Sequence, residues 1–552
     1  MYKYDEADRR FLTERVAQFR DQTSRYLAGK ISDEEFLPMR LQNGVYVQIH
    51  APMMRIAIPY GLLSSTQLRR LASITDKYDK SYGHFSTRQN MQINWPRIED
   101  IPDILEELAE VEMHAVQTSG NCVRNITADP FAGVAPDEIA DPRPWCELIR
   151  QWSTFHPEFA WLPRKFKIAV NASPDSDRAM AEIHDVGLCL VHRNGETGFR
   201  VLAGGGLGRT PVIGQWINEF VPAKHILTYL DAILRVYNLG GDRKHKYRAR
   251  IKIQVKNLGA EKFRELVDAE WEHLKDGPGT LTEKEIDRVS RHFTPSAYKT
   301  NLDPQKAAEV LLGQMAEDAE FRQWSETNTF AHKVPGYSAV VLTLKNTGTA
   351  PGDASSDIMR IVADLADEFS LGELRVSQDQ NLILPDVEIE RLHDLWIQAR
   401  EYGLAVPNAG MLTDMICCPG KDFCALAESH SIPVAKEIQQ RFDDLDYLHD
   451  IGELDLKVAG CLNACSHYHT GHIGICGLDR KGEEFYKIKL GGDTGIRTRL
   501  GDNLGAGAPR DKIVDVVEEV IKTYIDNRVE GERFIDTYDR IGLKPFMERV
   551  YG

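Results

Sequence analysis

The chain of 552 residues is longer than one ordinary hydrophobic core requires, so several packed units are expected. Its formal net charge of -16 at pH 7 disfavours general nucleic-acid binding, which needs an excess of Lys and Arg. Because no apolar run is long enough to span a bilayer, we expect neither a nucleic-acid partner nor membrane insertion.

The first residues carry apolar positions at helical spacing among many charges, as in "DEADRRFLTERVAQFRDQTSRYL". This pattern predicts a helical arm over residues 1–44 that wraps the surface. The segment has no apolar stretch of the kind that marks a secretory signal, so we expect a cytoplasmic protein.

A β-α-β-α order is predicted for residues 45–112. The strand-like run "GVYVQIHAPMMRIAIPYG" precedes a helical pattern with a Ser cap, "SSTQLRRLASITDKY". A second strand, "HFSTRQNMQINW", and a second helix, "IPDILEELAEV", follow. This order is typical of an α+β sandwich.

A comparable order returns at residue 337, in "YSAVVLTLKN", "SSDIMRIVADLADEF", "ELRVSQDQNLIL" and "VEIERLHDLWIQAREYG". The similarity extends beyond the sandwich. The run "LPRKFKIAVNAS" parallels "LDLKVAGCLNAC", and "GFRVLAGGGLGRTP" parallels "FYKIKLGGDTGIRTRLG". The sequence therefore predicts a two-copy molecule with a pseudo-twofold axis.

We expect an α+β fold of two pseudo-symmetric repeats, each a sandwich followed by a larger α+β lobe. After the arm, the expected units are a sandwich at 45–112, a lobe at 113–275, a linker at 276–335, a second sandwich at 336–405 and a second lobe at 406–552. The copies differ in charge, because Asp379 aligns with Arg88, and cysteines align with the "NAS" of the first copy.

Four cysteines come from two loops. Five residues separate Cys418 from Cys424, and three separate Cys461 from Cys465. In a reducing compartment such clusters bind metal or act in redox chemistry more often than they form disulfides. Four thiolates suit an iron-sulfur cubane. A zinc site stays open, although the first spacing is longer than zinc pairs usually have.

Lys165 and Lys167 lie two residues apart in a predicted strand, so both side chains project to one face while Phe166 and Ile168 face the other. Two ammonium groups on one face repel each other unless an anion lies between them. This spacing indicates an anion-binding surface.

Several motifs together resemble the assimilatory sulfite and nitrite reductase hemoprotein family. They are the Cys-x5-Cys and Gly-Cys-x-Asn-x-Cys pairs with "STRQNMQINW", "NCVRN", "LPRKFK", "GGGLG", "RKHKYRARIK" and "EGERF". The resemblance covers nearly the whole chain from about residue 40. It implies ferredoxin-like sandwiches, lobes that bind siroheme and a 4Fe-4S cluster, and cluster ligation by Cys418, Cys424, Cys461 and Cys465.

The same resemblance implies that Cys465 also bridges to the siroheme iron, which leaves Cys417 as a small buried neighbour. It implies that Arg88, Arg124, Lys165 and Lys167 bind an oxyanion at siroheme. We expect the two lysines to deliver protons. Nitrite-reducing members typically have Asn at the second Lys position, so "RKFK" looks like the sulfite type.

Further residues are expected around siroheme, whose carboxylates require cations. The expected cofactor contacts are Arg248, Arg250, Gly204, Gly205, Gly206, Asn121 and Gln92. The basic run 243–252 has an alternative interpretation, as a surface strand or a docking patch for an acidic donor. Some family members join Tyr and Cys at positions matching Tyr46 and Cys122; the alternative is an ordinary Tyr and a free thiol.

The glycine run is a weak dinucleotide motif, because Arg209 stands where a third Gly is required. Electrons are therefore expected from a separate ferredoxin or flavoprotein subunit. The predicted function is six-electron reduction of sulfite to sulfide in sulfur assimilation. The alternatives are reduction of nitrite to ammonia on the same cofactors, and a non-catalytic binding scaffold stabilised by zinc.

Overall fold

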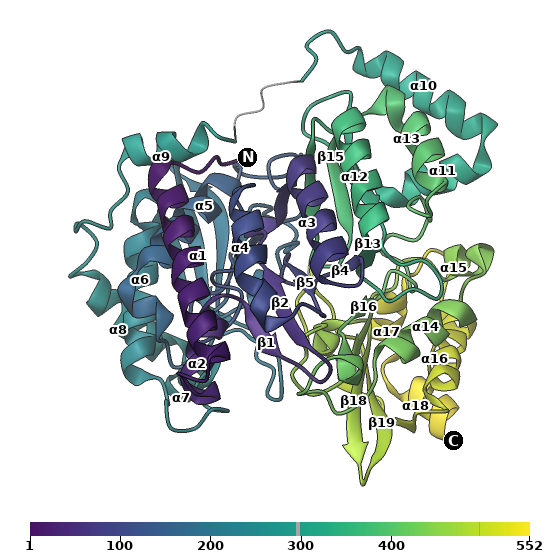
Figure 1. The fold of residues 1–552 in the computed structure, drawn as a ribbon. Helices are drawn as coiled ribbons and strands as arrows, with labels where there is room; N and C mark the ends of the chain where they lie inside the picture. The colour runs from purple at the N-terminus through teal and green to yellow at the C-terminus, as the bar shows by residue number, and fades with distance from the viewer. Residues whose placement is uncertain (294–297, 496) are drawn as a thin grey trace.

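The computed structural model describes residues 1–552 except 294–297 and 496 (Figure 1). Residues 294–297 belong to the predicted linker, and that part of the prediction lies outside the described residues. Among the described helices, none is both long enough and apolar enough to cross a membrane.

The N-terminal arm consists of α1 (Glu6–Leu27) and α2 (Asp33–Gln42). Each helix begins with a capping box, formed at Asp5 and at Ser32, which satisfies amide groups that the first turn leaves unpaired. The arm lies against the first half of the molecule, where α1 contacts α4 (Ile101–Ala109) and α2 contacts β1 (Val45–Val47) (Figure 1).

Two five-stranded sheets form the two sandwiches, and each borrows one strand from the other copy. The first, in spatial order, contains β1, β2 (Pro52–Ile56), β5 (Met91–Ile93), β4 (Tyr82–Phe85) and β13 (Asp353–Ser355). The second contains β11 (Thr329–Ala331), β12 (Tyr337–Leu342), β15 (Leu382–Glu388), β14 (Glu373–Val376) and β3 (Leu62–Ser64). Their covering helices include α3 (Ser65–Tyr78) and α4 in the first, and α12 (Ser356–Phe369) and α13 (Leu392–Arg400) in the second.

The exchange of strands joins the two copies into one core. Leu63 in β3 pairs with Leu374 in β14, and β13 pairs with β4, where His84 Nδ1 lies 2.8 Å from Asp353 Oδ1. Helix α3 packs against α12, and buried side chains of both copies form one continuous cluster. Neither sandwich is therefore complete without the other.

The two lobes have the same sheet plan, three parallel strands continued by antiparallel ones. The first sheet has β6 (Thr127–Ala128), β7 (Ile168–Asn171), β8 (Val186–Arg193), β9 (Glu196–Ala203) and β10 (Gln215–Pro222). The second has β16 (Ile416–Cys417), β17 (Leu456–Ala459), β18 (Ile473–Arg480), β19 (Glu483–Leu490), β20 (Asp502–Asn503) and β21 (Ala508–Pro509). The predicted α+β class with two repeats is confirmed.

Helices cover both lobes. Those of the first lobe are α5 (Arg143–Phe155), α6 (Ile226–Gly240), α7 (Ile251–Leu258) and α8 (Ala260–Trp271). Those of the second lobe are α14 (Ile432–Arg441), α15 (Leu445–Ile451), α16 (Ile513–Asn527), α17 (Phe534–Ile541) and α18 (Lys544–Tyr551). Within the predicted linker, α9 (Glu283–Ser290), α10 (Pro304–Glu317) and α11 (Ala319–Asn328) are formed, and Phe321 and Trp324 of α11 are buried in the shared core.

The interpretation of residues 243–252 as a strand is wrong. Residues up to Arg250 form turns, and α7 begins at Ile251. The segment therefore presents its basic side chains from a loop and from the first turn of a helix.

The strand exchange predicts that one buried side chain in β3 stabilises both copies. Leu63→Ala removes a fully buried side chain and should lower the free energy of unfolding by about 2–5 kcal/mol. Thermal unfolding followed by circular dichroism should show one transition at a lower temperature. Leu312→Ala, at a position 64% exposed on α10, should change stability by less than about 0.5 kcal/mol. A transition that splits into two, with one unchanged, would contradict a shared core.

Candidate functional site

The predicted alternation of Lys165 and Lys167 is present, in an extended segment that leads into β7. Phe166 and Ile168 are completely buried, and the two lysine side chains are half-buried on the opposite face. Across the described part of the chain, neither ammonium group has a hydrogen-bond or ion-pair partner. Both are therefore available to a ligand.

Arg88 and Arg124 reach the same place from two other segments. Arg88, in the turn between β4 and β5, donates 2.8 Å to Thr127 Oγ1, donates to the carbonyl oxygen of Asn125 and contacts His184 Nε2. Arg124 donates to the carbonyl oxygens of Thr118, at 2.9 Å, and Gly120, at 2.7 Å. All these acceptors are neutral, so both guanidinium groups keep an uncompensated positive charge.

The cations lower one another's pKa. Burial lowers the pKa of Lys165 to about 8. The thiol of Cys465 acts to raise this pKa, and Arg124 and Arg250 act to lower it. Burial, together with Lys165 and Arg88, holds the pKa of Lys167 well below its usual range. Burial and the charge of Arg124 lower the pKa of Arg88 to about 9. An anion bound among these groups would stabilise their charged forms.

Three further charged residues complete the surroundings, and sequence reasoning missed two of them, Arg55 and Asp185. Arg55 of β2 donates 2.8 Å to Gln92 Oε1, so Gln92, a predicted cofactor contact, positions an arginine here. Asp185, fully buried, accepts 2.7 Å from Arg250 Nη2 and 2.9 Å from the backbone N–H of Lys167. Lys252 of α7 donates 2.6 Å to the carbonyl of Leu207. Of the missed residues, only Arg55 could have been recognised from the sequence, because it is a charge inside the apolar strand "MMRIAI".

The predicted glycine contacts have a structural role within the protein. A Cβ on Gly205 would lie 2.4 Å from the carbonyl oxygen of His184, and one on Gly206 would lie 2.6 Å from Arg250 Nη2. At Gly204, φ is +83° and a Cβ would meet Val255 at 2.7 Å. These glycines let the backbone pack closely beside Arg250.

The remaining predicted cofactor contacts are exposed. Arg248 lies in the basic loop, and the structure gives its side chain no partner among the described residues. Asn121 is also exposed, and its backbone carbonyl accepts 2.9 Å from the N–H of Leu162. Both lie on elements that border the four cations, but neither side chain is fixed by the protein.

The four predicted ligand cysteines follow the ends of two adjacent parallel strands, β16 and β17. The backbone N–H of Gly460 points at Cys418 Sγ at 3.2 Å, and a Cβ on Gly460 would lie 2.7 Å from Gly420 Cα. Glycine at both positions therefore lets the two loops approach. The nine cysteines of the chain are free thiols.

The thiols lie near one another across a shared space. Burial and the charge of Cys465 raise the pKa of Cys418 to about 12, and Cys465 and Cys424 contribute to the raised pKa of Cys461, also about 12. Within the described ranges, no three His, Cys, Asp or Glu side chains are close enough to hold one metal ion. Four thiols on two adjacent loops are the donor set that a 4Fe-4S cluster takes, and the Cys-x5-Cys spacing is longer than zinc pairs usually have.

Cys465 links the cysteine loops to the cations. Its carbonyl oxygen accepts 2.8 Å from Thr87 Oγ1, the residue before Arg88, and its thiol opposes the fall in the pKa of Lys165. Cys465 is exposed, whereas Cys417 is buried and its Sγ points to the carbonyl of Cys418 at 3.2 Å. The structure therefore places Cys465 where the two halves meet at the site, and its bridge to siroheme iron stays a prediction.

Tyr46 and Cys122 lie beside Arg124, and all three residues line one cavity. Burial raises the pKa of Tyr46, but the charges of Arg124, Arg55 and Lys165 outweigh it and bring the pKa to about 8. Burial raises the pKa of Cys122, against the effect of Arg124. Both side chains thus contact one guanidinium group, and the thioether between them stays a prediction.

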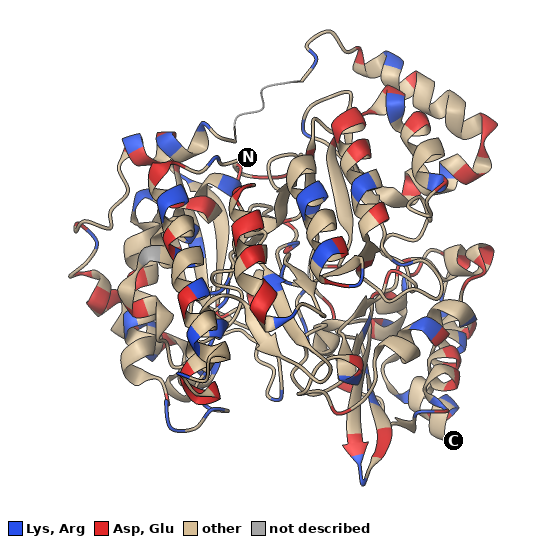
Figure 2. Ribbon diagram, in the orientation of Figure 1, with Lys and Arg blue, Asp and Glu red and all other residues tan. Residues whose placement is uncertain are grey.

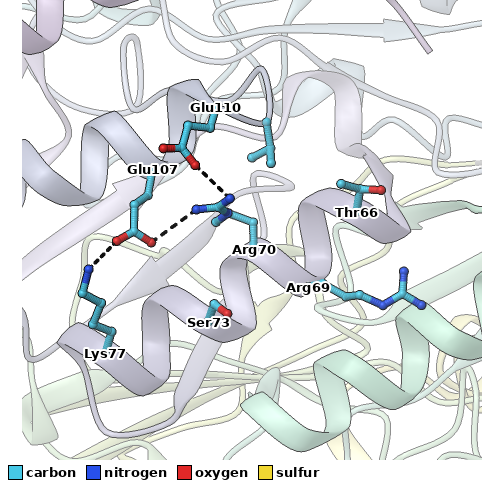
Figure 3. A pocket seen from close by; sticks show the side chains of 8 residues that line it. Thr66, Arg69, Arg70, Ser73, Lys77, Glu107 and Glu110 are labelled. Atoms are coloured by element: carbon cyan, nitrogen blue, oxygen red, sulfur yellow. Dashed lines mark hydrogen bonds and ion pairs between the residues drawn. The ribbon is translucent and has the colours of Figure 1, made fainter.

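A second hollow, of about 710 Å³, lies between α3 and α4, away from these residues (Figure 3). Its cations are neutralised, because Arg70 lies 2.9 Å from Glu110 and Lys77 lies 2.7 Å from Glu107. It offers no uncompensated charge and is not a candidate anion site.

Comparisons with known families agree with this arrangement. Residues 119–275 and 409–552 match the "Nitrite and sulphite reductase 4Fe-4S domain", and residues 48–111 and 332–402 match the "Nitrite/Sulfite reductase ferredoxin-like half domain". Each family model thus occurs once in each repeat.

Individual relatives cover most of the chain. Sulfite reductase [ferredoxin] 1 of Mycolicibacterium paratuberculosis is 27% identical over 87% of this chain and 81% of its own length. The chloroplastic ferredoxin–nitrite reductase of Arabidopsis thaliana is 27% identical over 85% of this chain and 75% of its own. The structure of the Mycobacterium tuberculosis NirA protein superposes with a TM-score of 0.76 at 25% identity, covering 94% of this chain and 92% of that one.

Adjacent cysteines provide a matched test of the ligand set. Cys418→Ala should greatly reduce the iron and acid-labile sulfide of the purified protein, because one of four thiolates is lost. Cys417→Ala should leave both unchanged, because that thiol points away to a carbonyl. Colorimetric iron and sulfide assays measure both contents. Equal loss in the two variants, or loss in Cys417→Ala alone, would contradict the assignment.

The ionisation of Tyr46 reports the positive field of the site. Ultraviolet difference titration should show one tyrosine ionising at about pH 8, and Tyr46→Phe should remove this step. Arg124→Gln should move the step to higher pH, because a cation that favours the phenolate is removed. If no tyrosine ionises at a pH below the ordinary range of phenols, the positive electric field described for this site is absent.

Proposed function

The chain belongs to the nitrite and sulfite reductase family, and we propose that it catalyses the six-electron reduction of sulfite to sulfide. The observation that carries the proposal is a group of half-buried cations without carboxylate partners beside Cys465. A small oxyanion compensates that charge. The second Lys of "RKFK", typical of the sulfite type, favours sulfite over nitrite.

The residues fit the two cofactors that the family implies. Cys418, Cys424, Cys461 and Cys465 would hold the 4Fe-4S cluster, and Cys465 would also approach siroheme. Arg250 lies on the cationic side of the site and would face a siroheme carboxylate, whereas the buried ammonium of Lys252 already donates to three backbone carbonyls. When bound, siroheme and the cluster supply single electrons to the substrate.

The protein side chains bind the substrate and deliver protons. Arg88 and Arg124 present guanidinium groups that match oxyanion oxygens. Reduction of sulfite removes three oxygens as water, and each oxygen takes up two protons as it leaves. The lowered pKa of Lys165, about 8, makes its ammonium a better acid at neutral pH than a free lysine. Asp185 accepts from the backbone N–H of Lys167 and so fixes that residue.

Nitrite reduction to ammonia is the second candidate, because nitrite is also a small oxyanion and the Arabidopsis thaliana relative is named a ferredoxin–nitrite reductase. The names of the relatives favour ferredoxin as the electron donor over a flavoprotein subunit. We propose a cytoplasmic assimilatory enzyme by analogy with the family.

Lys167→Gln tests proton delivery and substrate choice together. The variant should lower kcat/KM for sulfite by about 100-fold or more, because one general acid is removed, and should affect nitrite less. Initial rates with a chemically reduced viologen, on protein of checked siroheme content, give both values. Lys262→Gln, on the exposed face of α8, is the control. Full sulfite turnover by Lys167→Gln would exclude the proposed role, and a wild-type preference for nitrite would select the second candidate.

A further inference from the structure

A cavity of about 630 Å³ is lined by two of the four cations, Arg124 and Lys165. Helices α1 and α2 of the arm form one wall, and the loops around residues 116–124 and 156–165 form the other. Arg124 and Lys165 belong to its lining, so the cavity is continuous with the candidate site. Exposed Trp161 and Leu426 mark its outer side, at 62% and 69% exposure.

The lining of this cavity is basic in an acidic chain. The chain has 83 Asp and Glu against 67 Lys and Arg, and on most outer helices the two signs alternate (Figure 2). The described residues that line the cavity nevertheless include no Asp and no Glu. Its five cations are Arg15, Arg124, Arg164, Lys165 and Lys246. A concave surface of one sign concentrates small ions of the opposite sign.

Arg15 differs from the other arginines of α1. Four of them lie within ion-pair distance of a carboxylate: Arg9, Arg10, Arg20 and Arg25. Arg15 has no carboxylate partner among the described residues. It donates 2.8 Å to Gln18 Oε1 and 3.2 Å to Asn43 Oδ1, and its Nε is buried without any acceptor. An unpaired buried donor is costly unless a ligand accepts from it.

The arm is held in place, so Arg15 is positioned before any ligand arrives. Arg20 of α1 lies 2.5 Å from Asp103 and 2.7 Å from Glu106, both on α4. Arg9 lies 2.8 Å from Glu112. A fixed cation binds an anion without the cost of ordering a mobile side chain.

Arg164 is the third cation that faces the cavity without compensation. Its side chain has no hydrogen-bond or ion-pair partner in the described part of the chain, and burial and Arg124 lower its pKa. Arg15, Arg124 and Arg164 therefore surround one space from three separate segments. The family models begin at residue 48, so Arg15 lies outside the matched residues.

We propose that Arg15 is a substrate-binding residue: with Arg124 and Arg164 it captures a small inorganic oxyanion in this cavity, on the path to Lys165 and Arg88. The inference rests on the proposed function for the identity of the substrate. A carboxylate of siroheme has the same chemistry as an acceptor, and the experiment distinguishes the two sources.

The test compares Arg15→Gln with Arg10→Gln, a change on the same helix at a side chain 79% exposed. In holoenzyme at low ionic strength, Arg15→Gln should raise the KM for sulfite by about 5- to 10-fold, because one charge-assisted contact to the substrate is lost. Its kcat and siroheme content should equal those of the wild type, and added salt should reduce the difference. Arg10→Gln should behave as the wild type.

An unchanged KM in Arg15→Gln overturns the proposal. Loss of siroheme with an unchanged KM also overturns it, by assigning Arg15 to a cofactor carboxylate. Calorimetric titration of the holoenzyme with sulfite gives a readout without turnover, in which Kd should weaken by the same factor. Equal Kd values, or no binding to either protein, contradict the capture site. A wild type that binds sulfite but does not reduce it would disprove the proposed function and leave Arg15 testable.

Discussion

An excess of half-buried positive charge where the two halves meet is the constraint on which the rest of the structure depends. Three cations converge there: Arg88, Lys165 and Lys167. Among the described residues, Asp185 is the carboxylate that lies beside them. Its oxygens are already occupied by Arg250 and by a backbone N–H. Buried charge without a partner is unfavourable. The protein accepts this cost, and a bound oxyanion would relieve it.

The exchanged strands hold that charge together. Arg88 is carried by the turn between β4 and β5, and β4 pairs with β13 of the other copy. Thr87 in the same turn donates to the carbonyl of Cys465, which belongs to the second lobe. A displacement of either copy would therefore separate the cations from the cysteine loops. The shared core fixes the site more rigidly than either loop does alone.

Much of the fold and part of the site could be predicted from the sequence. The repeated order of elements implied two copies, and the alternation around Phe166 placed both lysines on one face. The exchange of β3 and β13 was not predictable, because strand pairing across copies leaves no periodic signal in either segment.

Other parts of the site depend on contacts between distant residues. The glycines at 204–206 were expected to approach a cofactor, and the fold shows in addition that they make room for the protein's own carbonyl and guanidinium groups. Gln92, expected to touch the cofactor, accepts from Arg55, a contact that the sequence did not predict. Arg15 in the arm resembled any surface charge in sequence. Only the fold shows that it lacks the acid partner that its neighbours on α1 have.

The central claim is that four cysteines and a group of unpaired cations house a 4Fe-4S cluster beside siroheme. The most direct measurement is the visible absorption spectrum of the purified protein, combined with iron and acid-labile sulfide assays and extraction of the tetrapyrrole. The account predicts a pigmented protein that contains siroheme and more iron than labile sulfide, because the siroheme iron adds to that of the cluster. A colourless protein that holds zinc in the four thiols would contradict it.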